Sequence, residues 1–223
     1  MKKFLTILTV VLLSGGSSVY GSQMEEFLSR GQSFWQRGLV EFLDDAAKSV
    51  REVDVEPAVA ARLETFTEIA GSYRIPVEEL KKAYQTAVMR AAGECIEKLK
   101  EDVAEKDYSA DGDIAFLMED VAGYIQFKYG DRIRACAGSV AQRELEKAMR
   151  ECISLRYSPM IDAFLRSGEC RELLKEFPGD VDRVVYRELH SREKELTENP
   201  SLTKEPTLRY ILENLRKFGL AGG

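Results

Sequence analysis

The sequence has little of what most catalytic sites require. It contains a single histidine, His190, so it can hold neither a two-histidine metalloprotease helix nor a multi-histidine zinc site. It has no G-x-S-x-G elbow, no Walker loop and no G-x-G-x-x-G turn, the motifs that mark hydrolase, nucleotide and dinucleotide sites. No two cysteines form a C-x-x-C pair, so the signatures of thioredoxin-like redox chemistry, c-type haem attachment and paired zinc ligands are absent.

An excess of positive charge is missing as well. The formal net charge of the 223 residues is −6, whereas sequence-independent nucleic-acid binding and electrostatic docking on anionic membranes both need surplus Lys and Arg. Beyond the N-terminus, no apolar stretch is long enough to span a bilayer. We therefore expect no nucleic-acid partner and no stable membrane insertion.

The N-terminus has the layout of a secretory signal peptide over residues 1–21. Two lysines precede an apolar run over residues 4–13, and small or polar residues then lead to Gly21, the last residue before a predicted cut at Ser22. An apolar run of this length covers about 15 Å as a helix, half of a bilayer's hydrocarbon core. The sequence therefore predicts export, either to a bacterial periplasm or to the extracellular medium.

The rest of the chain has the periodicity of helices. Apolar residues recur at gaps of three and four, as at Leu80, Tyr84, Ala87 and Ala91, and no segment shows sustained strand-like alternation. Prolines and glycines divide the chain into segments. The pattern predicts an all-α fold, an irregular bundle of about eight or nine helices. These helices are expected over residues 24–53, 58–73, 76–105, 113–129, 131–156, 160–166, 169–177, 178–197 and 207–218.

The predicted helices group into one domain with a C-terminal extension. The bundle covers residues 22–198, and a polar, proline-flanked linker follows over 199–206. An amphipathic helix then lies within 207–219. Its apolar face, over residues 207–218, would dock either on its own domain or on a partner, which leaves a homo-oligomer open.

The four cysteines suit an exported protein, because an even number in an oxidising compartment usually pairs. Cys136 and Cys152 fall on one predicted helix, about 24 Å apart along its axis, so they cannot bond to each other. Stacking that helix beside the two before it brings Cys95 level with Cys136 and leaves Cys152 for Cys170. The sequence thus predicts two structural disulfides, Cys95–Cys136 and Cys152–Cys170, with free buried thiols as the alternative.

Residues 107–119 resemble the front of an EF-hand calcium loop. Oxygen-bearing side chains alternate there before and after Gly112, and clustered oxygens of this kind suit Ca²⁺. The pattern departs at its end, where Met118 stands in place of the bidentate glutamate and Glu119 follows one residue late. A polar turn that caps the next helix is the alternative. Calcium is the one cofactor that the sequence suggests, with the candidate ligands Asp107, Ser109, Asp111 and Asp113.

Other candidate groups are ordinary for charged helices. His190 lies three residues before Glu193, which makes a carboxylate–histidine pair, but a lone histidine among charges is usually just solvated. Adjacent acids could serve in acid–base catalysis, although beside Lys and Arg they are typical of solvated helix faces. These adjacent acids are Asp44 and Asp45, Glu78 and Glu79, and Glu119 and Asp120.

These observations favour a non-enzymatic, exported helical module that binds a protein, a peptide or a component of the cell envelope. A small all-helical exported enzyme that works through carboxylates and arginines is the first alternative, and a calcium-dependent structural protein is the second. A deep pocket lined by convergent Arg and Glu would favour the enzyme. A filled core with an exposed apolar groove would favour the binding module.

Overall fold

The computed structural model describes residues 18–28, 30, 32–105 and 120–217. Within these ranges the chain forms nine α-helices, two short 3₁₀ turns and no strand, which confirms the all-α prediction. The helices are α2 (Ser18–Leu28), α3 (Gln32–Ser49), α4 (Glu56–Glu64), α5 (Phe66–Tyr73), α6 (Val77–Glu105), α8 (Val121–Cys152), α9 (Ser158–Leu165), α10 (Gly168–Glu198) and α11 (Pro206–Lys217). The 3₁₀ turns are η1 (Leu155–Tyr157) and η2 (Pro200–Leu202).

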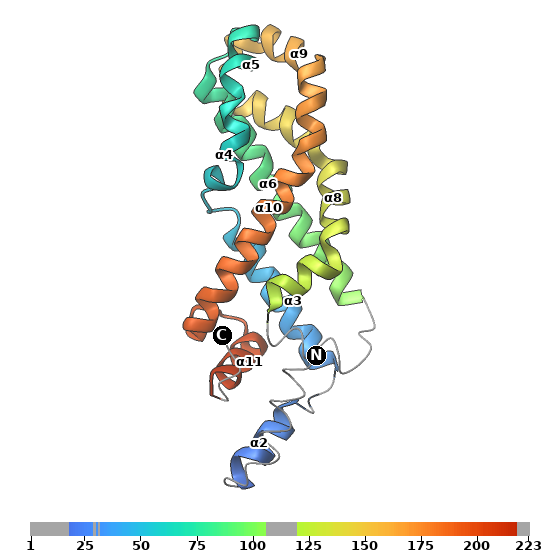
Figure 1. The fold of residues 1–223 in the computed structure, drawn as a ribbon, viewed down its shortest axis with the longest axis vertical. Helices are drawn as coiled ribbons and strands as arrows, with labels where there is room; N and C mark the ends of the chain where they lie inside the picture. The colour runs from blue at the N-terminus through green and yellow to red at the C-terminus, as the bar shows by residue number, and fades with distance from the viewer. Residues whose placement is uncertain (1–17, 29, 31, 106–119, 218–223) are drawn as a thin grey trace.

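Three long helices, α6, α8 and α10, run along the long axis of the molecule (Figure 1). Ion pairs show how α6 and α8 are aligned. Asp102 near the end of α6 pairs with Arg132 at 2.6 Å, while Arg90, a dozen residues earlier, pairs with Glu151 at 2.6 Å. The earlier residue of α6 thus pairs with the later residue of α8, so the two helices are antiparallel.

Helix α10 is likewise antiparallel to α8. Arg134 of α8 pairs with Asp182 at 3.1 Å, and the backbone N–H of Val121, at the start of α8, donates to Glu193 at 2.7 Å. The three long helices therefore run down, up and down in Figure 1.

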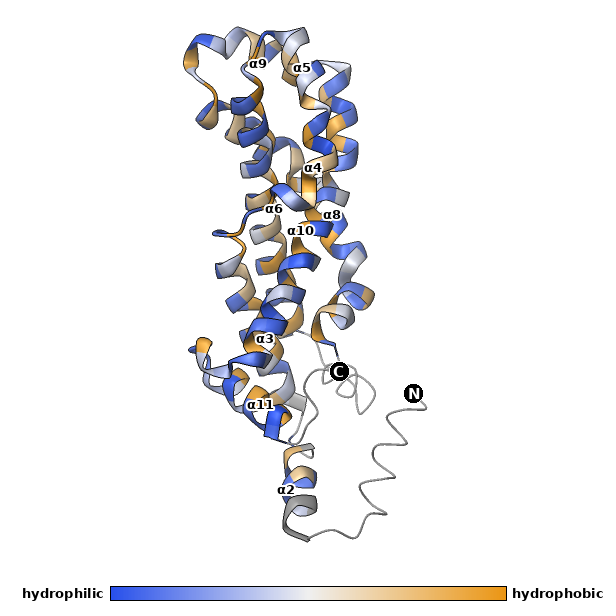
Figure 2. Ribbon diagram, turned by 60° about the vertical axis from the view of Figure 1, so that its left-hand side comes forward, coloured by the Kyte–Doolittle hydropathy of each residue, from blue (hydrophilic) through white to orange (hydrophobic). Residues whose placement is uncertain are grey.

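The fourth column of the bundle is broken into pieces. Helix α3 covers the lower half of the long helices, and α4 and α5 cover the upper half (Figure 1). Asp44 of α3 accepts from Lys100 of α6 at 2.8 Å, and Arg62 of α4 pairs with Glu176 of α10 at 3.0 Å. The result is an elongated helical bundle in which each long helix carries apolar and polar residues along its length (Figure 2).

The core runs through the whole bundle and contains residues from α3 to α11. Tyr84 packs between Phe66 and Phe177, with ring centroids 5.1 and 5.8 Å from its own. Small residues of α6, such as Ala87 and Ala91, are fully buried and let the neighbouring helices approach closely. None of the helices in the described ranges is both long and apolar enough to cross a membrane.

Two predicted helix breaks are wrong. The expected helices over 113–129 and 131–156 form, in the described part, one helix, α8, which passes through Gly130 and ends at Cys152. Glycine lowers helix stability by about 1 kcal/mol relative to alanine, but Tyr129 and Ile133 beside it are buried and hold the helix together.

The expected boundary at Pro178 is the second wrong break, because α10 is continuous from Gly168 to Glu198. Proline within a helix removes one backbone hydrogen bond and destabilises it by about 3 kcal/mol. Here Phe177 and Val181 on either side of Pro178 are fully buried, and their burial offsets that loss.

Two expected helices are, in turn, divided. The segment predicted as one helix over 58–73 forms α4 and α5, because the Thr65 hydroxyl donates to the Arg62 carbonyl oxygen at 2.7 Å and competes with the helical hydrogen bonds. The segment 24–53 contains α2 and α3. The predicted signal-peptide cut, between Gly21 and Ser22, lies inside α2.

Helix α11 docks on α3 of its own chain. Its apolar residues Leu208, Ile211, Leu212 and Leu215 are buried, and the Leu208 N–H donates to Glu41 of α3 at 2.6 Å. The preceding linker is packed as well, since Thr203 is fully buried. The apolar face that could have recruited a second copy is therefore covered within the chain.

The α3–α11 contact depends on Gly38, and its replacement gives a first testable expectation. A Cβ atom at Gly38 would overlap the Ile211 side chain, whereas a Cβ at Gly71 would meet nothing within 4 Å. The overlap falls on the terminal Cδ1 atom of Ile211, which can turn aside, and alanine gains helix propensity. We therefore expect Gly38→Ala to lower the free energy of unfolding by no more than about 1 kcal/mol through overpacking. Gly71→Ala, its matched control, should raise that free energy by about 0.5–1 kcal/mol through better helix propensity. Urea unfolding would measure both, and a stabilised Gly38→Ala would contradict the tight contact.

Candidate functional site

The cysteines at the α6–α8 contact lie together. Cys95 of α6 is 1% exposed, while Cys136 of α8 is half-buried; both line one hollow, and their thiols lie close enough for each to affect the ionisation of the other. The neighbouring Cys95 thiol lowers the pKa of the Cys136 thiol, and the cations of Lys98 and Arg143 act in the same direction. The nearby Cys136 thiol and burial raise the pKa of Cys95. Cys136 is thus the thiol that ionises first.

A hollow of about 340 Å³ opens over this thiol pair. Both cysteines line it, together with the charged side chains of Lys98, Asp102 and Arg132. Asp102 and Arg132 pair with each other at 2.6 Å across its rim. The Lys98 ammonium pairs with Glu94 at 3.2 Å. A small polar molecule can therefore reach Cys136 from solvent.

No disulfide is formed among the four cysteines, so the two predicted staples are not present in this structure. Cys95 and Cys136 are neighbours, but Cys152 and Cys170 are not aligned. The Cys152 thiol lies 3.7 Å from the Thr86 hydroxyl of α6. Because Arg134 is level with Asp182 in the antiparallel α8–α10 pair, Cys170 lies several residues below the level of Cys152. By that register Cys170 is level with Glu146, six residues before Cys152. Six residues of helix correspond to about 9 Å, beyond the reach of a disulfide.

A second group of side chains gathers at the start of α8. Asp120, His190 and Glu193 bring metal-ligating atoms within 4.8 Å of one another. Asp120 caps α8 by accepting from the Gly123 N–H at 2.7 Å. Glu193 reaches over from α10 and accepts from the N–H groups of Val121 at 2.7 Å and Ala122 at 3.0 Å. Sequence spacing predicts the His190–Glu193 pair, and the fold adds Asp120 to it.

The two carboxylates at this group have a structural task. The unpaired N–H groups at the start of a helix attract negative charge, and Asp120 and Glu193 together satisfy three of them. Burial raises the pKa of Glu193, although its backbone hydrogen bonds oppose that rise. One imidazole and two carboxylates could also hold a divalent cation such as Zn²⁺. The positive end of the helix works against a cation there, so capping explains the group better.

A buried carboxylate in the upper bundle forms a third cluster. Asp180 is fully buried, and its Oδ2 atom accepts from the Tyr84 hydroxyl at 2.5 Å and from the Arg62 Nε at 3.3 Å. Its Oδ1 atom accepts from Arg183. Both oxygens are thus engaged by donors from three directions. Asp180 stabilises the junction of α4, α6 and α10, and its satisfied state favours a structural role over a catalytic one.

Of the adjacent acids singled out in the sequence, Asp44, Asp45 and Glu78 pair with cations of their own helix or of a neighbouring one, while Glu119 lies outside the described residues. Asp44 contacts Lys48 and Lys100, with hydrogen bonds that lower its pKa. Asp45 pairs with Arg192 at 2.5 Å. Glu78 pairs with Lys81 at 3.2 Å and is largely exposed. Asp44 and Glu78 thus have the nearby lysine that charged helix faces usually carry, whereas the largely buried pair of Asp45 and Arg192 joins α3 to α10.

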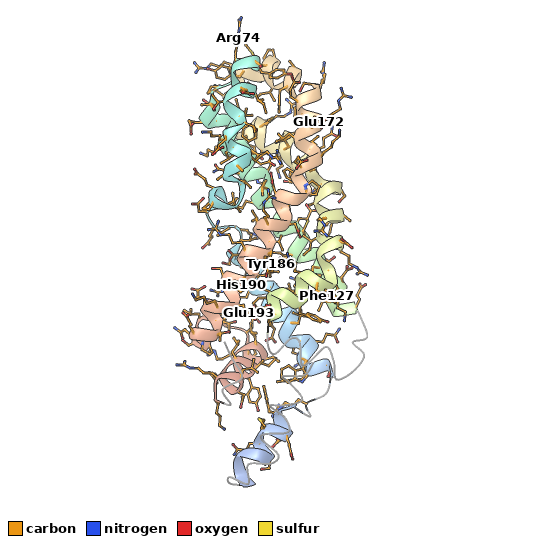
Figure 3. All side chains as sticks on the ribbon, viewed as in Figure 1. Arg74, Phe127, Glu172, Tyr186, His190 and Glu193 are labelled. Atoms are coloured by element: carbon orange, nitrogen blue, oxygen red, sulfur yellow. The ribbon has the colours of Figure 1, made fainter. Side chains whose placement is uncertain are left out.

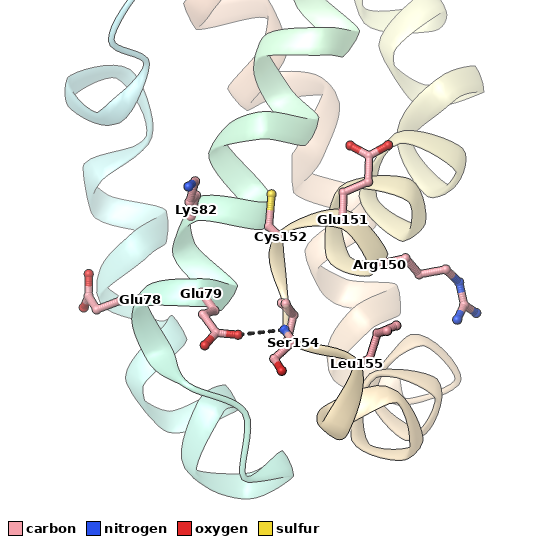
Figure 4. A pocket seen from close by; sticks show the side chains of 9 residues that line it. Glu78, Glu79, Lys82, Arg150, Glu151, Cys152, Ser154 and Leu155 are labelled. Carbon is pink, nitrogen blue, oxygen red and sulfur yellow. Dashed lines mark hydrogen bonds between the residues drawn. The ribbon is translucent and has the colours of Figure 1, made fainter.

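Glu79 lines an open hollow of about 570 Å³ between the start of α6 and the end of α8 (Figure 4). Its Oε2 atom accepts from the Ser154 N–H at 2.9 Å, and Lys82, Glu151 and Cys152 stand around it. Charges of both signs line this hollow, and Arg150, the arginine among its lining residues, pairs with Glu146 and Asp162. The arrangement therefore falls short of the deep Arg–Glu pocket that the enzyme alternative requires.

Aromatic side chains of unequal exposure lie along the α8–α10 contact, where Tyr186 is half-buried and packs against the core while His190 is exposed. Phe127 of α8 is 87% exposed. It stands seven residues before Arg134, two helical turns away on the same side, and Arg134 pairs with Asp182 of α10. Tyr186 and His190 follow Asp182 at helical spacing, and their rings stack with centroids 6.2 Å apart. We call Phe127, Tyr186 and His190 the α8–α10 seam (Figure 3).

The sequence could not single out this seam, because Phe127 fits an apolar helical pattern as well as any core residue. Which side of α8 faces solvent is decided by its packing against α6 and α10, contacts that the local pattern does not contain. The candidate calcium ligands Asp107, Ser109, Asp111 and Asp113 lie outside the described residues, so calcium binding stays a prediction.

Comparison with protein-family models, with curated proteins and with solved structures finds nothing that matches this chain.

Proposed function

We propose that this chain is an exported, non-enzymatic helical module that binds a protein or peptide through the α8–α10 seam. The observation that carries the proposal is the 87% exposure of Phe127 on a regular helix. A single exposed apolar residue is common on protein surfaces. Here a phenylalanine, a tyrosine and a histidine share one side of two packed helices, and aromatic residues are enriched where proteins bind one another.

The surroundings of the seam suit a protein partner. The Arg134–Asp182 ion pair borders it at 3.1 Å, and Asp131 beside Arg134 is exposed. Apolar rings with a charged border are the usual anatomy of a protein interface. The filled core and the fully paired Asp180 also support binding over catalysis.

Photocrosslinking in the native host tests this proposal. A photoreactive phenylalanine analogue at position 127 should give one discrete crosslinked partner in the cell envelope or medium. The matched control is the same analogue at Leu155, which is 83% exposed in η1, directly before α9, the helix at the top of Figure 1. We expect Phe127→Ala to change the free energy of unfolding by less than about 0.5 kcal/mol, as surface substitutions do.

Identical adducts at positions 127 and 155, or none at 127, would contradict binding through the seam. Fractionation of the same cells tests export, since the mature protein should begin at Ser22 and leave the cytoplasm. If the chain is found uncleaved in the cytoplasm, the prediction of export is wrong, while binding through the seam is left untouched.

A further inference from the structure

The thiol pair of α6 and α8 supports an activity that binding through the seam does not require. We propose that Cys95 and Cys136 form a thiol–disulfide exchange site for a disulfide of low molecular mass, in which Cys136 reacts first and Cys95 closes the bond. Three observations carry this: the contact of the two thiols, their unequal exposure, and the hollow above them.

The unequal exposure sets the order of the reaction. Cys95 is 1% exposed, so an incoming disulfide cannot reach it before Cys136. Cys136 is half-buried and lines the hollow. Thiolates rather than thiols attack disulfides, and the neighbouring Lys98 and Arg143 favour the thiolate of Cys136 while Glu94 opposes it.

The size of the hollow sets the class of the reactant. About 340 Å³ is at the small end of ligand pockets, enough for the half of a small peptide disulfide that carries the attacked sulfur, but not for a folded protein. Lys98 and Arg132 on its lining are cations, and Glu101 and Asp102 are anions. A reactant with both carboxylate and ammonium groups, such as oxidised glutathione, matches this mixed lining.

The exchange proceeds in two balanced steps. The Cys136 thiolate attacks one sulfur of the disulfide R–S–S–R, a mixed disulfide forms at Cys136, and one R–S⁻ leaves and takes up a proton. The Cys95 thiol loses its proton to solvent and attacks the Cys136 sulfur, which releases the second R–S⁻. The sum converts two cysteine thiols and one disulfide into the Cys95–Cys136 disulfide and two R–SH. The product is a covalent link between α6 and α8.

Oxidised glutathione added to the reduced, purified chain tests the order. In Cys95→Ser we expect a stable glutathione adduct on Cys136, found by peptide mapping. In Cys136→Ser we expect Cys95 to react at least about tenfold more slowly, because it is buried. The unmodified chain should lose two hydrogens, with the peptides of Cys95 and Cys136 joined and no lasting adduct on either.

Two results would overturn the proposal. One is that the two single variants react with oxidised glutathione at the same rate, although Cys136→Ser keeps only the buried Cys95 and Cys95→Ser keeps only Cys136. The other is a chain that reacts only with a protein disulfide and not with glutathione, which would reject the low-mass reactant. If a serine variant fails to fold, rapid alkylation of the unmodified chain at early times gives the same answer. An adduct on Cys136 should then precede the joined peptides, and an adduct on Cys95 appearing first would refute the order.

Discussion

Asp180→Ala is expected to lower the free energy of unfolding by about 3 kcal/mol, at the lower end of what breaking a buried ion pair costs. Asp180 is fully buried and accepts from Tyr84, Arg62 and Arg183. The two arginine side chains are 24% and 57% exposed and can turn toward water. The Tyr84 hydroxyl is buried and would lose its acceptor. Most of the loss in the free energy of unfolding therefore comes from this unsatisfied hydroxyl and from the cavity that the removed carboxylate leaves.

Two further variants test whether the effect of Asp180 on stability comes from its burial. Asp180→Asn keeps the volume and an acceptor for Tyr84, so we expect a smaller loss, about 1.5 kcal/mol. Glu176→Ala removes another partner of Arg62, at 3.0 Å but 62% exposed, and should change stability by less than about 1 kcal/mol. Chemical denaturation at neutral pH measures all three. If Asp180→Ala loses no more free energy of unfolding than Glu176→Ala, the junction at Asp180 does not contribute to stability as described.

The same junction predicts a loss of stability in alkali. Burial raises the pKa of Tyr84, and the negative charge of Asp180 raises it further. The folded chain therefore keeps a proton that the unfolded chain releases above about pH 10. This contribution to stability is fully present below pH about 10 and declines as the pH rises, by at most about 1.4 kcal/mol per pH unit. Tyr84→Phe should show a shallower decline, and identical slopes would contradict the assignment.

The helices could be predicted from the sequence where residues next to their ends mark the boundaries. Pro76 begins the apolar stripe of α6, and the predicted span of 76–105 agrees with Val77–Glu105. Gly130 and Pro178 misled the prediction for one common reason. Each weakens an isolated helix, yet each lies in a helix whose neighbouring residues are buried by contacts from far along the chain. Local propensity loses to tertiary packing at such positions.

The sites depend even more on distant contacts. The contact of Cys95 and Cys136 was expected from a stack of three helices, while the structure brings them together on two antiparallel neighbours. Glu193 caps a helix that begins 72 residues earlier in the chain, and no local pattern predicts that. Asp180 follows a Pro–Gly pair typical of an exposed turn, so its burial could not be predicted either.

The second large effect concerns the link between α6 and α8. Oxidation of Cys95 and Cys136 is expected to stabilise the fold by about 4 kcal/mol, because the bond closes a loop of some forty residues in the unfolded chain. For a chain of this size that corresponds to a rise in melting temperature of roughly 8–15 °C. Thermal unfolding of the chain, reduced and after glutathione oxidation, measures the shift. In the double variant Cys95→Ser/Cys136→Ser, oxidation should leave the melting temperature unchanged.

The mass of the intact chain distinguishes the single disulfide expected here, Cys95–Cys136, from the two disulfides that the sequence predicts. Cys152 lies against Thr86 and out of register with Cys170, so the oxidised chain should be two hydrogens lighter than the reduced one. A loss of four hydrogens, with Cys152 joined to Cys170, would mean that α8 and α10 shift relative to each other on oxidation. A loss of two hydrogens without a rise in melting temperature would mean that the bond strains the α6–α8 contact by about as much as it restricts the unfolded chain. The sign and size of the shift therefore report how closely the reduced geometry of Cys95 and Cys136 already suits the bond.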